Sequence, residues 1–395
     1  MKRIFLPAIL IFAMLAPACQ SQKPITVNHV RSADVKPGSQ GIFYVLPRTV
    51  VTVDVTVVRT QQVPGPYAEF AARFLGLQNV IHQPSTNFEI SEIKINSYAE
   101  PDPAQFYFVE LPNASEKQPL FISLSESGLI QSINRPFNND EFLKGISETR
   151  EYGYFGSDGT FNYFIDTNLQ ERVDTILERV RVDTLTVERQ TLRRSMVEKS
   201  PEVRAKEVAD FILKIRDKRF DIINGFAEIP YSKEALEYMY TEMGQLEEDY
   251  LQLFRGLKST SQIHYRFTYR PDPDLSTTSQ ALFQFSEREG VLPAGRRDGT
   301  PITISTERNE TTRQLGTFLS RNADPQSPAN GFFYRIPEHA NIIIRTGNIV
   351  RANARMLINQ FGVITTLPAT DTEVEFYPNT GSIRSIGRLI DNEEN

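Results

Sequence analysis

A run of alternating residues places the strongest constraint on how this chain folds. Between residues 50 and 60, Val51, Val53, Val55 and Val57 occupy every second position, and mostly polar residues stand between them. Successive side chains of a β-strand point to opposite faces of a sheet, and β-branched residues favour strands. The segment therefore predicts a strand whose valine face packs against a core.

Similar strand patterns recur along the chain and are separated by turn residues. They occupy residues 41–47, 87–98, 105–111, 120–124, 129–133, 262–270, 281–285, 301–306, 331–336, 342–345, 355–359, 362–367 and 373–376. Short strands at this spacing are typical of antiparallel β-structure. Residues 66–76 form a predicted short helix, with Pro66 near its start and Gly76 after its end.

The middle of the sequence changes to a helical period. Ser200 and Ser232 each precede a helical pattern and are suitable N-terminal caps. In the second pattern apolar residues step by three and four, at Leu236, Met239, Met243, Leu246, Tyr250, Leu253 and Leu257. We interpret residues 200–258 as two helices that pack antiparallel, because a short connection joins them. Packing on the chain's own β-structure and use as a partner-binding coiled coil both remain open.

Two pairs of segments resemble each other in sequence. Residues 41–47 (GIFYVLP) match residues 331–337 (GFFYRIP), and residues 127–133 (SGLIQSI) match residues 380–386 (TGSIRSI). Both matches occur in the same order, which favours a duplication over chance similarity. The expected fold class is therefore α+β and mostly antiparallel β, with two possibly related β-sandwich-like domains and a central antiparallel helical hairpin.

The N-terminal segment has the layout of a secretion signal. Lys2 and Arg3 precede an apolar run at residues 4–15, and small residues follow before Cys19. An apolar run of this length is too short to cross a bilayer as a stable helix. We expect residues 1–18 to be removed as a signal peptide and Cys19 to carry a lipid. Ordinary secretion with cleavage after Ala18 and a chance cysteine are the alternatives.

The composition narrows the classes of function. Cys19 is the only cysteine, so intrachain disulfides are excluded, and acylation of this thiol would exclude cysteine catalysis. The net charge of −6 argues against nucleic-acid binding, which requires a basic surface. At 395 residues the chain is long enough for two or three domains.

These patterns give the expected order of segments. The expected boundaries are 1–18 for the signal peptide, 19–40 for the lipidated cysteine and a flexible tether, 41–170 for an N-terminal β-domain with one short helix, 171–199 for long strands or a linker, 200–258 for the helical hairpin and 259–390 for a C-terminal β-domain.

No catalytic, nucleotide-binding or metal-binding motif is present in the sequence, so we expect no catalytic residues, no cofactor and no metal site. Aromatic residues gather among glycines at 152–164, and Tyr152, Tyr154, Phe155 and Tyr163 are candidates for stacking on a sugar. The same residues also suit the anchoring of a loop to a core.

Several phrases of the sequence resemble a known family. They are FYVLPRTVVTVDVTV at 43–57, the segment 192–226, and EALEYM and LEEDYLQLF within the second helical pattern. They are similar to the Bacteroidetes envelope lipoproteins of the domain-of-unknown-function family numbered 4831. The resemblance implies a cell-envelope location and supplies no activity. Surface-exported lipoproteins of that group tend to carry acidic residues soon after the cysteine, and residues 20–24 (QSQKP) contain none.

The sequence therefore favours a non-enzymatic outer-membrane lipoprotein that faces the periplasm and acts as a scaffold or adaptor for other envelope proteins. Its expected partners are the membrane, through the N-terminal lipid, and envelope proteins. A glycan-binding module that uses the aromatic loop 152–164 is the alternative. A hydrolase whose residues meet only in space is a third hypothesis.

Overall fold

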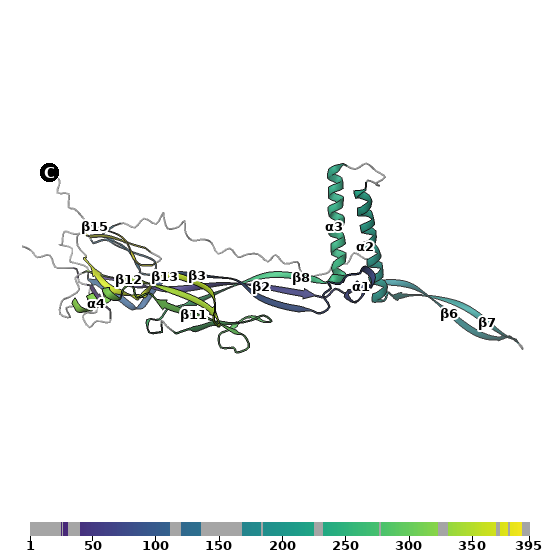
Figure 1. The fold of residues 1–395 in the computed structure, drawn as a ribbon, viewed down its shortest axis with the longest axis horizontal. Helices are drawn as coiled ribbons and strands as arrows, with labels where there is room; N and C mark the ends of the chain where they lie inside the picture. Colours follow the sequence, from purple (N-terminus) through teal and green to yellow (C-terminus); the bar gives the residue numbers. More distant parts are fainter. Residues whose placement is uncertain are drawn as a thin grey trace, which may run out of the picture.

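The computed structural model of the chain is an elongated molecule built largely from antiparallel strands (Figure 1). It describes residues 25, 27–30, 40–110, 120–135, 168–182, 185–224, 232–275, 278–322, 331–368, 372–377 and 380–388. Four α-helices accompany the sheets within these residues. The expected α+β class, with mostly antiparallel β-structure, is confirmed.

The first sheet joins strands from distant parts of the sequence. Its order is β1-β3-β2-β8, and its members are β1 (Val27–His29), β2 (Gly41–Val63), β3 (Ser85–Glu110) and β8 (Leu257–Tyr269). β2 pairs with β3 along nearly its whole length and with β8 on its other edge, from Val51 opposite Tyr269 to Val63 opposite Leu257. This pairing gives β2 a neighbour on both sides.

The second sheet is formed by the C-terminal part of the chain. Its order is β10-β9-β11-β12-β13, and its members are β9 (Gln280–Ser286), β10 (Gly290–Pro293), β11 (Thr300–Arg308), β12 (Phe332–Thr346) and β13 (Ile349–Leu367). β12 and β13 form a long hairpin that supplies two of its five strands. The expected separate strands at 331–336 and 342–345 are one continuous strand.

A hydrophobic core lies between these two sheets. The first sheet contributes Val51, Val53, Val55 and Val57, which are at most 1% exposed, as their alternation predicts. The second sheet contributes residues of β9, β11, β12 and β13, namely Phe283, Ile302, Ile304, Ala340, Ile342, Ile344, Ile358 and Phe361. Burying a valine side chain contributes about 1.5–3 kcal/mol, so this face accounts for much of the preference for the observed register.

The third sheet contains strands from one pair of matching segments, 127–133 and 380–386. Its order is β15-β14-β5-β4, and its members are β4 (Ile122–Leu124), β5 (Ile130–Ile133), β14 (Thr372–Phe376) and β15 (Ile383–Arg388). β5 pairs with β14 at Ile133 opposite Val374. A second core covers this sheet and includes Tyr44, Tyr107, Phe332 and Leu367 from the ends of the long hairpins.

The helices pack at the far end of the first sheet. α1 (Ala71–Leu75) follows a 3₁₀ turn at Ala68–Phe70, and Gly76 ends it with a φ of 66°. α2 (Pro201–Ile223) and α3 (Lys233–Arg255) lie against each other and stand across the long axis of the molecule (Figure 1). α4 (Arg313–Asn322) lies in the β body. A third core of Tyr67, Ala71 and the bases of α2 and α3 joins the helices to the β2–β3 connection.

Serine caps begin both long helices, as the sequence predicts. The Ser200 hydroxyl accepts a hydrogen bond from the Val203 N–H, and the Ser232 hydroxyl accepts one from the Ala235 N–H. Pro201 at the first helical position has a suitable φ and no N–H that needs a partner. Such caps each stabilise a helix by about 1 kcal/mol.

A two-stranded ribbon precedes the helices. β6 (Leu169–Val182) and β7 (Leu185–Glu198) pair from Leu169 opposite Glu198 to Val182 opposite Leu185. They form a sheet of their own and run away from the β body beyond the helices (Figure 1).

Strands from both expected β-domains share sheets in this arrangement. β8 belongs to the expected segment 259–390, apart from its first two residues, and pairs with β2 of the segment 41–170. Likewise, β14 of the expected segment 259–390 pairs with β5 of the segment 41–170. The domain boundaries given above stay a prediction.

Candidate functional site

Every residue for which the sequence predicts a role in lipidation or ligand binding lies outside the part of the chain that the structure describes. These residues are Cys19, the expected lipidation site, and Tyr152, Tyr154, Phe155 and Tyr163 of the aromatic loop. Lipidation and ligand binding at these positions therefore stay predictions. The described residues offer other candidate sites, which we take in turn.

The seam between α2 and α3 is tight at its base. Ala205, Val208 and Ile212 of α2 are buried against Tyr250 and Phe254 of α3. At the same level, Phe211 and Tyr250 place their ring centroids 4.8 Å apart. The periodic apolar residues of the sequence thus anchor the helical pair to the molecule at this end.

A charged cluster joins the helices farther from the base. Glu247 of α3 accepts hydrogen bonds from the Arg216 Nε at 2.7 Å and from the Arg219 Nη1 at 2.5 Å. Burial favours a higher pKa for Glu247, but these two guanidinium groups outweigh it and lower the pKa below its usual value. Arg219 also lies over the Tyr240 ring, 4.4 Å from its centroid. The cluster holds the two helices in register.

The free end of the helical pair is apolar and exposed. Phe220 and Ile223 of α2 are 64% and 65% exposed, and Tyr238 of α3 is 66% exposed. An open hollow of about 530 Å³ lies between the helices here, and Ile222, Leu236 and Tyr240 are among its lining residues. Contiguous exposed apolar surface on a folded protein commonly marks a site of interaction. The sequence pattern did not predict this exposure, because it identified the apolar stripe that includes Leu236 but not the exposed apolar residues beside it.

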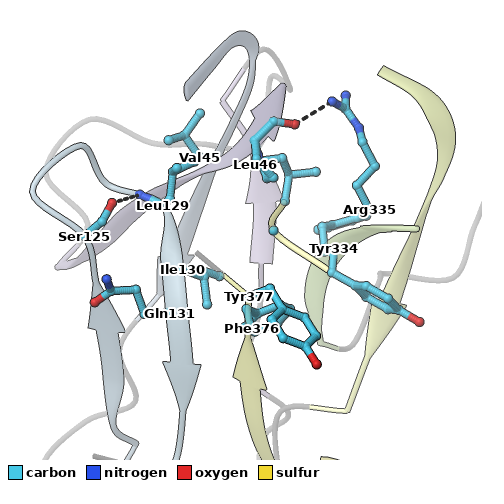
Figure 2. A pocket seen from close by; sticks show the side chains of 13 residues that line it. Val45, Leu46, Ser125, Leu129, Ile130, Gln131, Tyr334, Arg335, Phe376 and Tyr377 are labelled. Atoms are coloured by element: carbon cyan, nitrogen blue, oxygen red, sulfur yellow. Dashed lines mark hydrogen bonds between the residues drawn. The ribbon is translucent and has the colours of Figure 1, made fainter. Parts of the chain in front are cut away.

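A small cavity lies where the matching segments 41–47 and 331–337 meet (Figure 2). Side chains from β2, β5, β12 and β14 converge on it, including Val45, Ile130, Tyr334 and Phe376. Its volume is about 30 Å³. That is close to the volume of one water molecule in the liquid, whereas pockets for small molecules usually measure about 300–1,000 Å³.

A buried ion pair lies beside this cavity. The Arg335 Nη1 donates to the Pro47 carbonyl oxygen at 2.8 Å (Figure 2, dashed line), and the Arg335 Nη2 donates to Asp102 Oδ2 at 3.0 Å. The two side chains are only 6% and 12% exposed. Next to them, Tyr107 stacks on Phe333, and burial raises the pKa of Tyr107 to about 12. These groups join β2, β3 and β12, which indicates a structural role.

Glu338 forms a second buried polar centre in the β body. Its carboxylate is 1% exposed and accepts hydrogen bonds from Arg308, from the Thr312 hydroxyl at 2.9 Å and from the Glu310 N–H at 2.8 Å. Burial favours a higher pKa, but the hydrogen bonds from Arg308 and Thr312 outweigh it and lower the pKa of Glu338. With the carboxylate fully occupied by protein donors, the centre fixes the start of α4 to β12.

Two further observations concern the described residues as a set. No group of three or more His, Cys, Asp and Glu side chains among them is placed to hold a metal ion. Within the same residues, no helix has both the length and the apolar character needed to cross a membrane.

The fold and these sites define an elongated, mostly antiparallel β protein from which a helical pair and a β-ribbon project. A family model described as a domain of unknown function (DUF4831) matches residues 40–152 and 165–384. The chain belongs to this family, as its sequence phrases indicated. Neither the curated proteins nor the solved structures contain a match to the chain.

Proposed function

We propose that the chain is a non-enzymatic lipoprotein of the cell envelope that acts as a scaffold or adaptor for other envelope proteins. The observation that carries the proposal is the free end of the helical pair, which stands away from the β body (Figure 1). This end exposes Phe220, Ile223 and Tyr238. A groove between two helices that is apolar and open suits a peptide segment or a helix of another protein.

Attachment to the membrane would occur through Cys19, with residues 20–40 as a tether. The absence of acidic residues at positions 20–24 favours an outer-membrane anchor that faces the periplasm. The tether would separate the elongated body from the lipid surface, which leaves the helical pair accessible to partners.

The energetic basis of docking is the burial of apolar surface. Fully burying a large exposed apolar side chain contributes roughly 1.5–3 kcal/mol, so the residues at the helical end would supply a large favourable part of the binding free energy. The Glu247 cluster holds both helices in place before binding, which reduces the entropic cost of ordering the surface.

The test is in-cell crosslinking followed by purification of the tagged, membrane-anchored chain. A variant that combines Phe220→Ser, Ile223→Ser and Tyr238→Ser should lose a crosslinked protein that the unmodified chain recovers. Phe121→Ser is the matched control, because Phe121 is 61% exposed and lies on the β body. Equal recovery of the same proteins by the triple variant and the control would overturn the docking assignment.

The anchor needs its own experiment. Cys19→Ala should abolish acylation of the mature N-terminus, detected by mass spectrometry, and should move the protein from the membrane to the soluble fraction. An unchanged membrane fraction would contradict the lipoprotein assignment.

We also infer that the β body contains two related β-sandwich-like halves and that α2 and α3 form a helical hairpin inserted between them. Support comes from the matching segments 41–47 and 331–337, which begin the two long hairpins. Both hairpins contain a register shift of the same size. In the first hairpin Val45 pairs with Phe106 and Pro47 with Pro101. In the second hairpin Ile336 pairs with Val363 and Glu338 with Ile358.

A further inference from the structure

The β6–β7 ribbon has little to stabilise it within one chain. It is a two-stranded sheet that pairs with no other described strand, and it projects away from the rest of the molecule (Figure 1). A sheet of two strands is marginally stable in water, whereas additional strands or a packing partner make it stable. The outer edge of β6 therefore carries unpaired backbone groups that can accept another strand.

One face of the ribbon carries exposed aliphatic side chains among charged ones. Residues opposite each other in an antiparallel pair point to the same face, so the pairing sets the members of each face. The large apolar residues of this face, with their exposed fractions, are Leu169 (43%), Val173 (50%), Leu177 (59%), Leu192 (64%) and Met196 (62%). Exposed aliphatic side chains on a projecting ribbon favour association with another surface.

The charges of β6 identify that surface. Residues 171–179 read Glu-Arg-Val-Asp-Thr-Ile-Leu-Glu-Arg, with Thr175 at the centre. When two such segments pair antiparallel about Thr175, Glu171 of one lies opposite Arg179 of the other, and Val173 lies opposite Leu177. No position within the segment faces a like charge, so the edge is complementary to itself.

We propose that the chain forms a two-fold symmetric dimer in which the β6 strands of two copies pair antiparallel about Thr175. The product is a four-stranded sheet in the order β7-β6-β6-β7, with Val173 of each copy beside Leu177 of the other. A two-fold contact uses the same patch on both copies, which a self-complementary strand satisfies. Opposite-charge and aliphatic cross-strand pairs each stabilise a sheet.

The composition of the ribbon disfavours a lipid surface as the occupant. Residues 169–198 contain six acidic and six basic residues and no aromatic residue. Elements that lie on membranes combine a basic surplus with aromatic side chains at the interface. Equal numbers of acidic and basic residues on the ribbon suit pairing with a second copy, because acidic residues of one copy can face basic residues of the other.

The first test places a cysteine on the two-fold axis. In the full-length chain with Cys19→Ala, Thr175→Cys is the only thiol, and each copy would hold it opposite its counterpart. Mild oxidation should convert most of this variant to a disulfide-linked dimer on a non-reducing gel. Thr191→Cys is the matched control, because Thr191 is equally an exposed ribbon threonine but lies on β7, opposite Ile176. Crosslinking of Thr175→Cys at the level of the control would overturn the proposal.

The second test separates pairing between copies from ion pairs within one chain. Glu171 pairs with Arg194 at 3.5 Å and Arg179 pairs with Glu188 at 3.0 Å within the ribbon. Glu171→Arg should weaken dimerisation measured by sedimentation by about tenfold, because it places like charges opposite each other twice in the dimer.

Adding Arg179→Glu to Glu171→Arg should restore the dimer. The double variant recreates opposite charges between copies, but within the chain it keeps the repulsion against Arg194 and adds a second one against Glu188. Recovery of dimerisation therefore supports the proposed register. If the double variant dimerises no better than Glu171→Arg alone, the charges act within the chain and the proposed register is wrong.

Discussion

Replacing Glu338 by Gln should destabilise the β body by about 3 kcal/mol, because breaking a buried ion pair costs about 3–5 kcal/mol and Arg308 can partly turn to water. The structure supports the lower end of this range. Arg308 is 34% exposed, whereas the Glu338 side chain is 1% exposed. Gln keeps one carbonyl oxygen for the Thr312 hydroxyl or the Glu310 N–H, but its amide group then faces donors that it cannot accept from.

The assay is urea unfolding of the full-length Cys19→Ala chain, followed by far-ultraviolet circular dichroism because the chain has no tryptophan. Glu307→Gln is the matched control on the neighbouring strand. Glu307 is 57% exposed and pairs with Arg345 at 3.4 Å, so its replacement should cost less than about 1 kcal/mol. Equal losses for the two variants would refute the assignment of Glu338 as a structural centre.

The same pair of proteins gives a pH dependence. Because the folded state lowers the pKa of Glu338, its charge contributes stability above the unfolded pKa of about 4.3, and that contribution is lost as the pH falls through the folded pKa. The difference in unfolding free energy between the unmodified chain and Glu338→Gln should be full at pH 7 and should shrink below about pH 4.5. A difference that grows as the pH falls would have the wrong sign for this reasoning.

Two further predictions concern the junction of the repeated segments. Arg335→Met should lower the unfolding free energy by about 3–5 kcal/mol, because it leaves Asp102 buried without its partner, and adding Asp102→Leu should recover most of the loss in the same urea assay. Gly331→Ala should lower the urea midpoint much more than Gly347→Ala, because both have positive φ but only Gly331 would direct a methyl group into the Leu367 carbonyl.

Local patterns were sufficient to predict the strands with clear alternation. The buried valines of β2 and the inward-facing Tyr265, Phe267 and Tyr269 of β8 lie as the period of two indicates. Ser200 and Ser232 cap their helices for a similarly local reason, because each hydroxyl accepts a hydrogen bond from the backbone N–H three residues later. Interactions of this kind need no knowledge of the rest of the fold.

The continuity of long strands was harder to predict. Residues 87–98 and 105–111 were expected as two strands, and Pro101 and Pro103 stand between them. They belong to one strand, β3, whose register against β2 shifts between Val45 and Pro47. A proline removes one hydrogen bond from the ladder, and an irregular stretch does not require that bond. The pairing with β2 therefore carries the strand through a break in the local pattern.

The partners of the buried charges could not be predicted from the sequence. Arg335 and Asp102 are separated by 233 residues, and Glu338 and Arg308 by 30. Charged residues at such positions look like solvent-exposed residues of alternating strands, and only the sheet order brings them together. The exposed apolar surface at the free end of the helical pair was not predicted for a related reason. Helical spacing identifies an apolar stripe, but it does not show how far along the helix that stripe is buried.

The matching segments 41–47 and 331–337 meet at a heavily buried junction. Residues 41–47 and 331–337 begin the long hairpins β2–β3 and β12–β13, and both hairpins shift register at about the same distance from that start. The two segments also contact each other, because the Tyr44 hydroxyl accepts a hydrogen bond from the Phe333 N–H at 2.9 Å and its ring packs on Phe332. Both segments therefore contribute to the same hydrophobic core. A substitution in this segment of either copy, such as Arg335→Met, should therefore destabilise both hairpins together and produce a single unfolding transition for the β body.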